Sequence, residues 1–259
     1  MTTPAAPPEP PPEVPNEEPA GKYLTLVEHL EELRFRLFVS AVAVVVGLAV
    51  SAYFAGDLIE FLKKPAEASN PDFHLQFIEP FELFVAYFRV ALLGGLIFGM
   101  PMIVYQTLRF VSPGLKSGER RWLYLTALGA TLFFVAGVAF AYYVALPPAL
   151  DFLLNFGGDL AEPNIRVSSY IDFVTRLLFW TGVSFETPLV VMFLGRFGIV
   201  SPSQLLRWWR YAIIIAFIIA AVVTPTIDPV TQSLVAGPII TLYFLGIILA
   251  WLVRPRRHV

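Results

Sequence analysis

The chain has 259 residues, of which 57% are hydrophobic and only 15% are charged. Soluble domains average about 45–50% apolar and about 25% charged residues, so this composition excludes an ordinary soluble domain and indicates a membrane-embedded protein. The net charge is -2 and there is no cysteine, which excludes disulfides, thiolate metal sites and cysteine nucleophiles.

Residues 1–21 form a low-complexity segment rich in Pro and Glu. Such a composition cannot bury a core, so a disordered or polyproline II tail is expected. A spacer is favoured over a proline-rich ligand for a partner domain.

An amphipathic stretch, His29-Leu30-Glu31-Glu32-Leu33-Arg34-Phe35-Arg36-Leu37, separates this tail from the apolar part of the chain. Leucines at 26, 30, 33 and 37 recur at helical spacing, and Glu32 precedes Arg36 by four residues. Two interpretations are open. The stretch is either a membrane-interface helix with one local ion pair, or a surface that presents carboxylates to a ligand.

Six apolar segments follow, and they predict an all-α polytopic membrane protein. Crossing a bilayer takes about 20 apolar residues, so the fifth segment, with sixteen, and the sixth are predicted to be short helices. Lys63-Lys64-Pro65 is expected to end the first segment, and Pro147-Pro148 the third. The six segments are Arg36–Leu62, Phe81–Phe110, Arg120–Leu146, Tyr170–Phe197, Trp208–Val223 and Gln232–Val253.

Basic residues predict the orientation of these segments. Thirteen Lys and Arg residues flank the side that holds the N-terminus, and three lie in the opposite loops. The positive-inside rule therefore places both termini in the cytoplasm, with 22–253 as the membrane domain and 254–259 as a basic cytoplasmic tail. The external loops are expected to cap the outer face, and Arg89 and Arg176, inside spans, to snorkel to the outer interface.

Polar groups in the first cytoplasmic loop allow two interpretations. Ser117 caps the third segment with Glu119 in its first turn, or Glu119 is an exposed carboxylate. Paired with Glu32, an exposed Glu119 would bind guanidinium groups, because arginine offers a planar fork of donors to a carboxylate.

Glu186 and Asp228 are the other carboxylates of interest. Glu186 lies near the middle of the fourth segment, where an ionisable group costs about 2.5–3.5 kcal/mol or more unless it has a partner or water. Pro188, two residues later, is expected to kink that helix. Glu186 is either a structural hydrogen-bonding group or a functional polar site, and Asp228 is interpreted first as a cap of the sixth helix.

Four motifs in order resemble the TatC family, the multispanning receptor subunit of the twin-arginine (Tat) protein translocase. They are HLEELRFRL, YQxxxFxxPGL…ExR from Tyr105 to Arg121, SFExP from Ser184 to Pro188, and TPxxDxxxQ from Thr224 to Gln232. The match covers about Leu26 to Trp251, the whole membrane domain.

The resemblance implies a glove-like, concave six-helix protein of the inner membrane that is not an enzyme. It would bind twin-arginine signal peptides of folded cargo, assemble with single-span TatA and TatB-type partners and with copies of itself, and use the proton motive force. Neither cofactor nor nucleic acid is implied. The residues implied at the signal-peptide site are Glu32, Glu119, Arg34, Phe110, Arg120 and Arg121. Glu186 resembles the buried glutamate of the family, Pro65 its external-loop proline, and Asp228 and Gln232 its external-turn residues near the partners.

Two other classes compete with this interpretation. A secondary transporter would need a midplane site, with Glu186 as its centre, and several further polar groups. An intramembrane enzyme would need a catalytic pair within the spans, and neither a Ser–His pair nor a second deep carboxylate is found there by sequence. A receptor for a peptide requires neither, because its polar residues cluster at a cytoplasmic surface.

Overall fold

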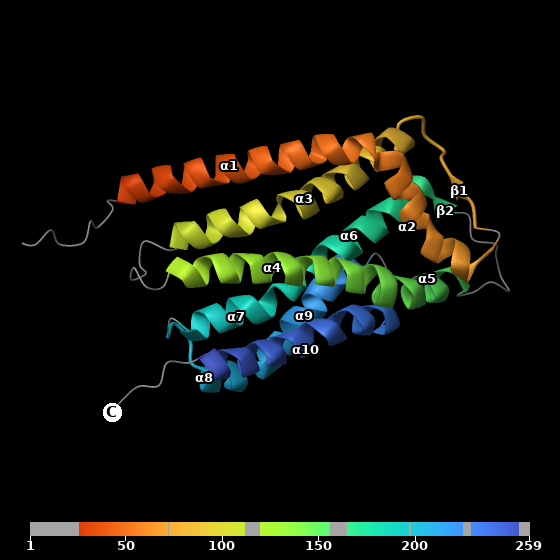
Figure 1. Cartoon of the computed structure of the whole chain (residues 1–259). Helices are drawn as coiled ribbons and strands as arrows, with labels where there is room; N and C mark the ends of the chain where they lie inside the picture. Colours follow the sequence, from red (N-terminus) through yellow and green to blue (C-terminus); the bar gives the residue numbers. More distant parts are fainter. Residues whose placement is uncertain are drawn as a thin grey trace, which may run out of the picture.

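The computed structural model describes residues 26–71, 73–111, 120–155, 165–196, 198–224 and 229–253. Nearly all of them are helical (Figure 1). The elements in chain order are α1 (Leu26–Tyr53), α2 (Ala55–Ser69), β1 (Leu75–Gln76), α3 (Glu82–Val111), α4 (Arg120–Phe140), η3 (Ala141–Ala145), α5 (Leu146–Asn155), β2 (Ile165–Arg166), α6 (Val167–Phe185), α7 (Thr187–Arg196), α8 (Pro202–Arg207), α9 (Trp209–Val223) and α10 (Pro229–Val253).

The long helices lie side by side, and the start of α1 and the end of α10 are at the same end of the molecule (Figure 1). Within the described residues, five helical segments are long and apolar enough to cross a membrane, and α9 is a shorter apolar helix. The prediction of an all-α polytopic membrane protein with a short fifth helix is therefore confirmed. The sixth helix differs in length, because α10 begins at Pro229 and has 25 residues.

The first apolar segment is not one span, as was predicted, because it breaks at Phe54. The amide of Phe54 donates to the carbonyl of Ser51 at 3.1 Å, which closes α1 with a tight turn. The chain then continues as the separate amphipathic helix α2, which contains Lys63-Lys64-Pro65 instead of ending there. Helix α2 buries Ala55, Ile59, Leu62 and Ala66 on one face, and this burial favours a helix lying across the end of the bundle over a continuous span.

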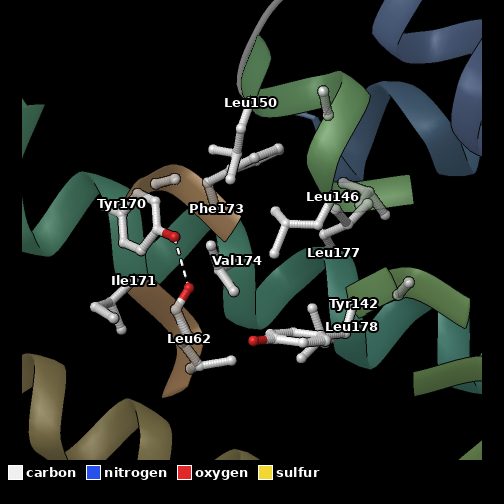
Figure 2. Close-up of a cluster of buried hydrophobic side chains, with 14 of the residues drawn as sticks. Leu62, Tyr142, Leu146, Leu150, Tyr170, Ile171, Phe173, Val174, Leu177 and Leu178 are labelled. Carbon is white, nitrogen blue, oxygen red and sulfur yellow. Dashed lines mark hydrogen bonds between the residues drawn. The ribbon is translucent and has the colours of Figure 1, made fainter. Parts of the chain in front are cut away.

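Pro65 therefore lies inside a helix and not in an external loop. A proline has no amide hydrogen, so the carbonyl four residues earlier, that of Phe61, loses its usual helical donor. The hydroxyl of Tyr142 donates to this carbonyl at 2.7 Å. The hydroxyl of Tyr170 donates to the next carbonyl, that of Leu62, at 2.6 Å (Figure 2). The bond from Tyr142 offsets the helical donor that is lost at Pro65, whereas the carbonyl of Leu62 also has its ordinary helical donor, the amide of Ala66.

The third apolar segment also extends further than predicted, through Pro147-Pro148 to Asn155. A π-helical turn, η3, precedes the prolines, and the amide of Leu146 donates to the carbonyl of Ala141. The prolines then occupy the second and third positions of α5, directly after the π-helical turn, within a helical segment that runs from Thr126 to Asn155. The wide turn thus resets the hydrogen-bond register ahead of the prolines.

The fourth segment begins at Val167 and is interrupted at Glu186, between α6 and α7. Regular helix is thus interrupted two residues before Pro188, and the kink expected from this proline stays a prediction. The amides of Leu189 and Val190 both donate to the carbonyl of Glu186, at 3.0 Å each, and this starts α7.

Small residues let α1 and α3 approach closely. A Cβ placed on Gly95 would lie 2.7 Å from the backbone nitrogen of Leu48, and one on Gly47 would lie 2.8 Å from the carbonyl oxygen of Gly95. Such small residues at helix contacts are typical of membrane proteins, where close packing replaces the hydrophobic effect. The contact aligns the first turns of α1 with the last turns of α3.

The end of the molecule opposite the start of α1 is built from the two loop regions that were predicted to be external (Figure 1). Strands β1 and β2 pair in parallel, with Leu75 opposite Ile165 and Gln76 opposite Arg166. The guanidinium of Arg166 contacts the buried carboxylate of Glu82 and lies 3.3 Å from that of Glu79. The hydrogen bond to Glu82 and the negative charges of Glu82 and Glu79 raise the pKa of Arg166 above its ordinary value, so its guanidinium stays protonated at any physiological pH.

The main hydrophobic core includes buried side chains of α2, α5 and α6 (Figure 2). Leu146 and Leu150 from α5 pack with Ile171, Val174 and Leu177 from α6 against the buried face of α2. The described core therefore anchors the end of the molecule opposite the start of α1, and the end that holds the start of α1 carries a polar cluster.

Candidate functional site

The candidate site is a polar and aromatic cluster where the first turns of α1 meet the last turns of α3. Helical spacing places His29, Glu32 and Arg36 on one face of α1, and this face turns toward Gln106 and Phe110 of α3. Glu31 is exposed, whereas Glu32 is partly buried in this contact. The register of α1 therefore selects Glu32 as the carboxylate that faces α3.

Arg36 joins Glu32 to α3. Its Nε donates to Oε1 of Glu32 at 3.0 Å, and its Nη2 contacts the same oxygen. Its Nη1 donates to Oε1 of Gln106 at 3.3 Å. Only 12% of the Arg36 side chain is exposed, so the guanidinium is fixed between two helices instead of moving freely in solvent.

The second carboxylate oxygen of Glu32 is less occupied. Its Oε2 lies 4.0 Å from Nδ1 of His29, which is too long for a hydrogen bond. The ring of His29 stacks on that of Phe110, with centroids 4.3 Å apart and planes 17° from parallel. A carboxylate oxygen beside a pair of stacked rings suits a guanidinium ligand, because a guanidinium donates hydrogen bonds to carboxylates and also stacks on aromatic faces.

The remaining predicted members of this site are only partly described. Arg34 is exposed on α1 and Phe110 is half-buried on α3. Glu119 lies outside the described residues, as do the side chains of Arg120 and Arg121, whose backbone begins α4. The end of α3 and the start of α4 lie at the same end of the molecule as the first turns of α1 (Figure 1).

Glu186 lies at the break between α6 and α7, within the fourth membrane segment. Its Oε1 is buried and has no hydrogen-bond partner in the described part of the chain. Close helix contacts surround the break, because a Cβ on Gly137 of α4 would lie 2.8 Å from Phe185, and one on Gly246 of α10 would lie 3.0 Å from Pro188. A structural hydrogen bond to a described group therefore does not explain this carboxylate.

The external-turn residues are separated from both clusters. Gln232 is half-buried in the first turn of α10, and Asp228 lies outside the described residues. Pro65 is in α2, at the end of the molecule opposite the start of α1. The structure thus brings Glu32 and Phe110 together and leaves Glu186, Gln232 and Pro65 as separate sites.

The charged cluster of Arg89, Asp172 and Arg176 and two residues of the site were not predicted from the sequence. Asp172 of α6 bridges Arg89 and Arg176, which were expected only to snorkel. The spacing of four residues between Asp172 and Arg176 was an available signal, whereas the contact with Arg89 joins distant segments. His29 and Gln106 belong to motifs that were recognised, but their contacts with Phe110 and Arg36 depend on the packing of α1 against α3. In the described residues, no group of three or more His, Asp or Glu is placed to hold a metal ion.

Comparisons with known proteins agree on one family. The family model described as "Sec-independent protein translocase protein (TatC)" matches residues 28–238. The chain is 40% identical over 232 residues to the Sec-independent protein translocase protein TatC of Synechocystis, covering 90% of each chain. It is 39% identical over 236 residues to that of Aquifex aeolicus, covering 90% of this chain and 98% of the relative. With the chloroplastic protein of Arabidopsis thaliana it shares 42% identity over 238 residues, 92% of this chain and 68% of the relative.

Solved structures agree with the sequence comparisons. A crystal structure titled as the twin-arginine translocase receptor TatC superposes with a TM-score of 0.79 at 39% identity, covering 87% of this chain and 99% of the other. A second crystal structure of that receptor, in DDM, gives a TM-score of 0.80 at 40% identity, covering 86% of this chain and 99% of the other.

Proposed function

This chain belongs to the TatC family of Sec-independent protein translocase proteins, and from this we propose that it is the receptor that binds twin-arginine signal peptides at its cytoplasmic face. The family makes it a multi-pass membrane component of the Tat protein translocase and not an enzyme. The alternative of a secondary transporter centred on Glu186 has no support among the relatives.

The observation that carries the proposal is the Glu32 cluster. Glu32 presents one carboxylate oxygen, Oε2, that has no hydrogen bond from Arg36, next to the stacked rings of His29 and Phe110. One arginine of the signal peptide would pair with this oxygen and lie against the rings. A lysine could pair with the oxygen but could not form the planar stack, and this difference supports selection of arginine.

The second arginine of the motif would bind Glu119. This residue precedes α4 in the segment that follows Phe110, and α4 starts at the same end of the molecule as the Glu32 cluster. Three basic residues would support the site by interacting with the two carboxylates and with lipid headgroups at the cytoplasmic surface: Arg34, Arg120 and Arg121. Two separated carboxylates suit a motif of two adjacent arginines, because each guanidinium then has its own acceptor.

Glu186 would serve the translocation step. Its buried Oε1 lacks a partner among the described residues, and a carboxylate at membrane depth needs a polar partner or water. We assign it to a hydrated groove on the concave face, where an inserted signal peptide or a partner side chain would contact it. Asp228 and Gln232, at the external turn before and within α10, would contact single-span TatA and TatB-type subunits. Pro65 would help to shape the external cap.

The protein would lie in the cytoplasmic (inner) membrane with both termini in the cytoplasm. This orientation follows from the thirteen basic residues on the side of the termini against three on the other side. Residues 1–21 and 254–259 would form cytoplasmic tails around the membrane domain, 22–253. Several copies would act together with the partner subunits, and the proton motive force would drive transport.

The function is tested by complementation in a bacterium that lacks its own TatC. The full chain, expressed with its TatA and TatB-type partners, is expected to export a folded reporter with a twin-arginine signal peptide and not the same reporter with twin lysine. The natural sequence has no cysteine, so Ser69→Cys and Ser203→Cys test orientation in the same cells. An impermeant thiol reagent should label the first from outside and not the second. Failure of export at normal abundance, or the reverse labelling, would contradict the proposal.

A further inference from the structure

We propose that Arg89, Asp172 and Arg176 form a binding site for the phosphate of an anionic phospholipid in the outer leaflet. Nη1 of Arg89 lies 2.7 Å from Oδ1 of Asp172, and Nη2 of Arg176 lies 2.9 Å from Oδ2. Each oxygen of one carboxylate thus holds a different guanidinium. Arg89 also reaches the carbonyl of Ser168 at 3.5 Å.

The charges of this cluster do not cancel. Two guanidinium groups and one carboxylate give a local charge of about +1, because arginine stays protonated in proteins. The described contacts use only one nitrogen of each guanidinium. The arginine side chains are 40% and 54% exposed, so both guanidinium groups remain accessible at the protein surface.

The surroundings identify the ligand as a lipid. Both arginines belong to segments that can cross a membrane, Glu82–Phe110 and Val167–Arg196. Exposed Phe88 and Trp180 flank them in the chain. A 29-residue helix is about 43 Å long and exceeds a hydrocarbon core of about 30 Å by about 6 Å at each end if it is centred. Arg89, about 10 Å from the start of α3, would then lie about 4 Å inside the hydrocarbon boundary.

At that depth the accessible guanidinium groups need an acceptor that can reach them. Hydrocarbon offers none, and an unsatisfied polar group there costs several kcal/mol. A lipid phosphate lies just above the boundary, carries the complementary negative charge, and accepts hydrogen bonds from two guanidinium groups at once. Asp172 fixes both arginines in place, so that the site is organised before the lipid binds.

The test titrates lipid into the purified full chain in detergent and measures thermal unfolding with dioleoyl-phosphatidylglycerol or dioleoyl-phosphatidylcholine. We expect tighter binding of the anionic lipid. Arg89→Gln and Arg176→Gln should each weaken its binding about fivefold, the equivalent of about 1 kcal/mol for one basic residue at a membrane surface. Lys63→Gln, an equal charge change in α2 at the external end, should leave the lipid preference unchanged.

Asp172→Asn separates lipid binding from a purely structural role. This variant loses the ion pairs but keeps both guanidinium groups and raises the local charge to about +2. Stability in detergent alone should fall, while the preference for the anionic lipid should persist. If the double variant Arg89→Gln/Arg176→Gln keeps the full preference for phosphatidylglycerol, the proposal is wrong. If that double variant does not fold, Arg176→Gln alone is used, because Arg176 is the more exposed of the two side chains. An undiminished preference for phosphatidylglycerol in this single variant would likewise show that the proposal is wrong.

Discussion

Arg36 contacts a single carboxylate oxygen of Glu32, with Nε at 3.0 Å and Nη2 on the same atom. The pair is therefore side-on and not a two-oxygen fork. Gln106 holds the third nitrogen of the guanidinium at 3.3 Å. Arg36, an arginine of the chain itself, thus occupies one of the two oxygens of the carboxylate that we assign to the signal peptide. It also places a positive charge next to the position where the signal-peptide arginine would bind.

The first prediction concerns this internal arginine. Arg36→Gln should strengthen binding of a twin-arginine peptide about fivefold at low salt, because it removes both a competitor for Glu32 and a like charge within a few ångströms of the ligand. Binding is measured by fluorescence anisotropy with the purified chain. Arg207→Gln, an exposed arginine of α8, controls for the change in net charge. Weakened binding in Arg36→Gln would show instead that Arg36 is needed to position Glu32.

The second prediction concerns the contact between α1 and α3. Gly95→Ala places a methyl group 2.7 Å from the backbone nitrogen of Leu48 and 2.9 Å from the carbonyl oxygen of Val44, so the helices must separate. We expect a loss of about 1–3 kcal/mol in the free energy of unfolding, seen as a lower Tm in detergent. Gly237→Ala in α10 has no atom within 4 Å of the new methyl group and should not lower the Tm. Equal Tm values for both variants would contradict the packing.

The third prediction tests whether Tyr142 compensates for Pro65. Tyr142→Phe should destabilise the protein by about 1–3 kcal/mol, because it leaves the carbonyl of Phe61 without a donor. In a Pro65→Ala background the restored amide donates to that carbonyl, so the same change should cost less than half as much. Chemical denaturation of the natural protein, the two single variants and the double variant completes a double-mutant cycle. We expect a coupling free energy of at least about 0.5 kcal/mol between the two changes.

Tyr170→Phe is the matched control for this cycle. Its hydroxyl contacts the carbonyl of Leu62, whose ordinary helical donor is the amide of Ala66 and not that of residue 65. Its cost should therefore change little in the Pro65→Ala background. Equal coupling for Tyr142 and Tyr170, or none for either, would rule out the specific link between Tyr142 and Pro65.

Sequence alone predicted the six apolar helices and the pairing of Glu32 with Arg36, because both depend on local hydropathy or helical spacing. It did not predict the break at Phe54, because Leu58, Ile59 and Leu62 continue the apolar pattern past it, although Asp57 and Glu60 already give α2 a polar face. The donor that replaces the missing amide of Pro65 is the hydroxyl of Tyr142, which comes from a distant segment of the chain. The contact of Arg36 with Gln106 spans 70 residues and requires the glycine contact between α1 and α3. Such features arise from tertiary packing, which a single sequence does not encode locally.

The fourth prediction concerns Glu186, the carboxylate at the break between α6 and α7. Glu186→Gln keeps a hydrogen-bonding group and should retain part of the export activity. Glu186→Leu should insert and accumulate normally, because it removes a polar group that is costly at membrane depth, but it should reduce export more. Export of a folded reporter is measured alongside abundance in the membrane. Normal export by an abundant Glu186→Leu protein would show that the carboxylate has no role in transport.

The fifth prediction, the binding of a twin-arginine peptide by Glu32 variants, tests the central claim most directly. Affinity is measured with the purified chain for a twin-arginine peptide and for its twin-lysine counterpart. Glu32→Gln should lose about 1.5–3 kcal/mol of binding, or about 10- to 150-fold, together with most of the preference for arginine over lysine. Glu119→Gln should have a similar effect. Glu31→Gln, the same change at the exposed neighbour, should bind like the natural protein. Undiminished affinity and preference in the Glu32→Gln/Glu119→Gln double variant would contradict the account.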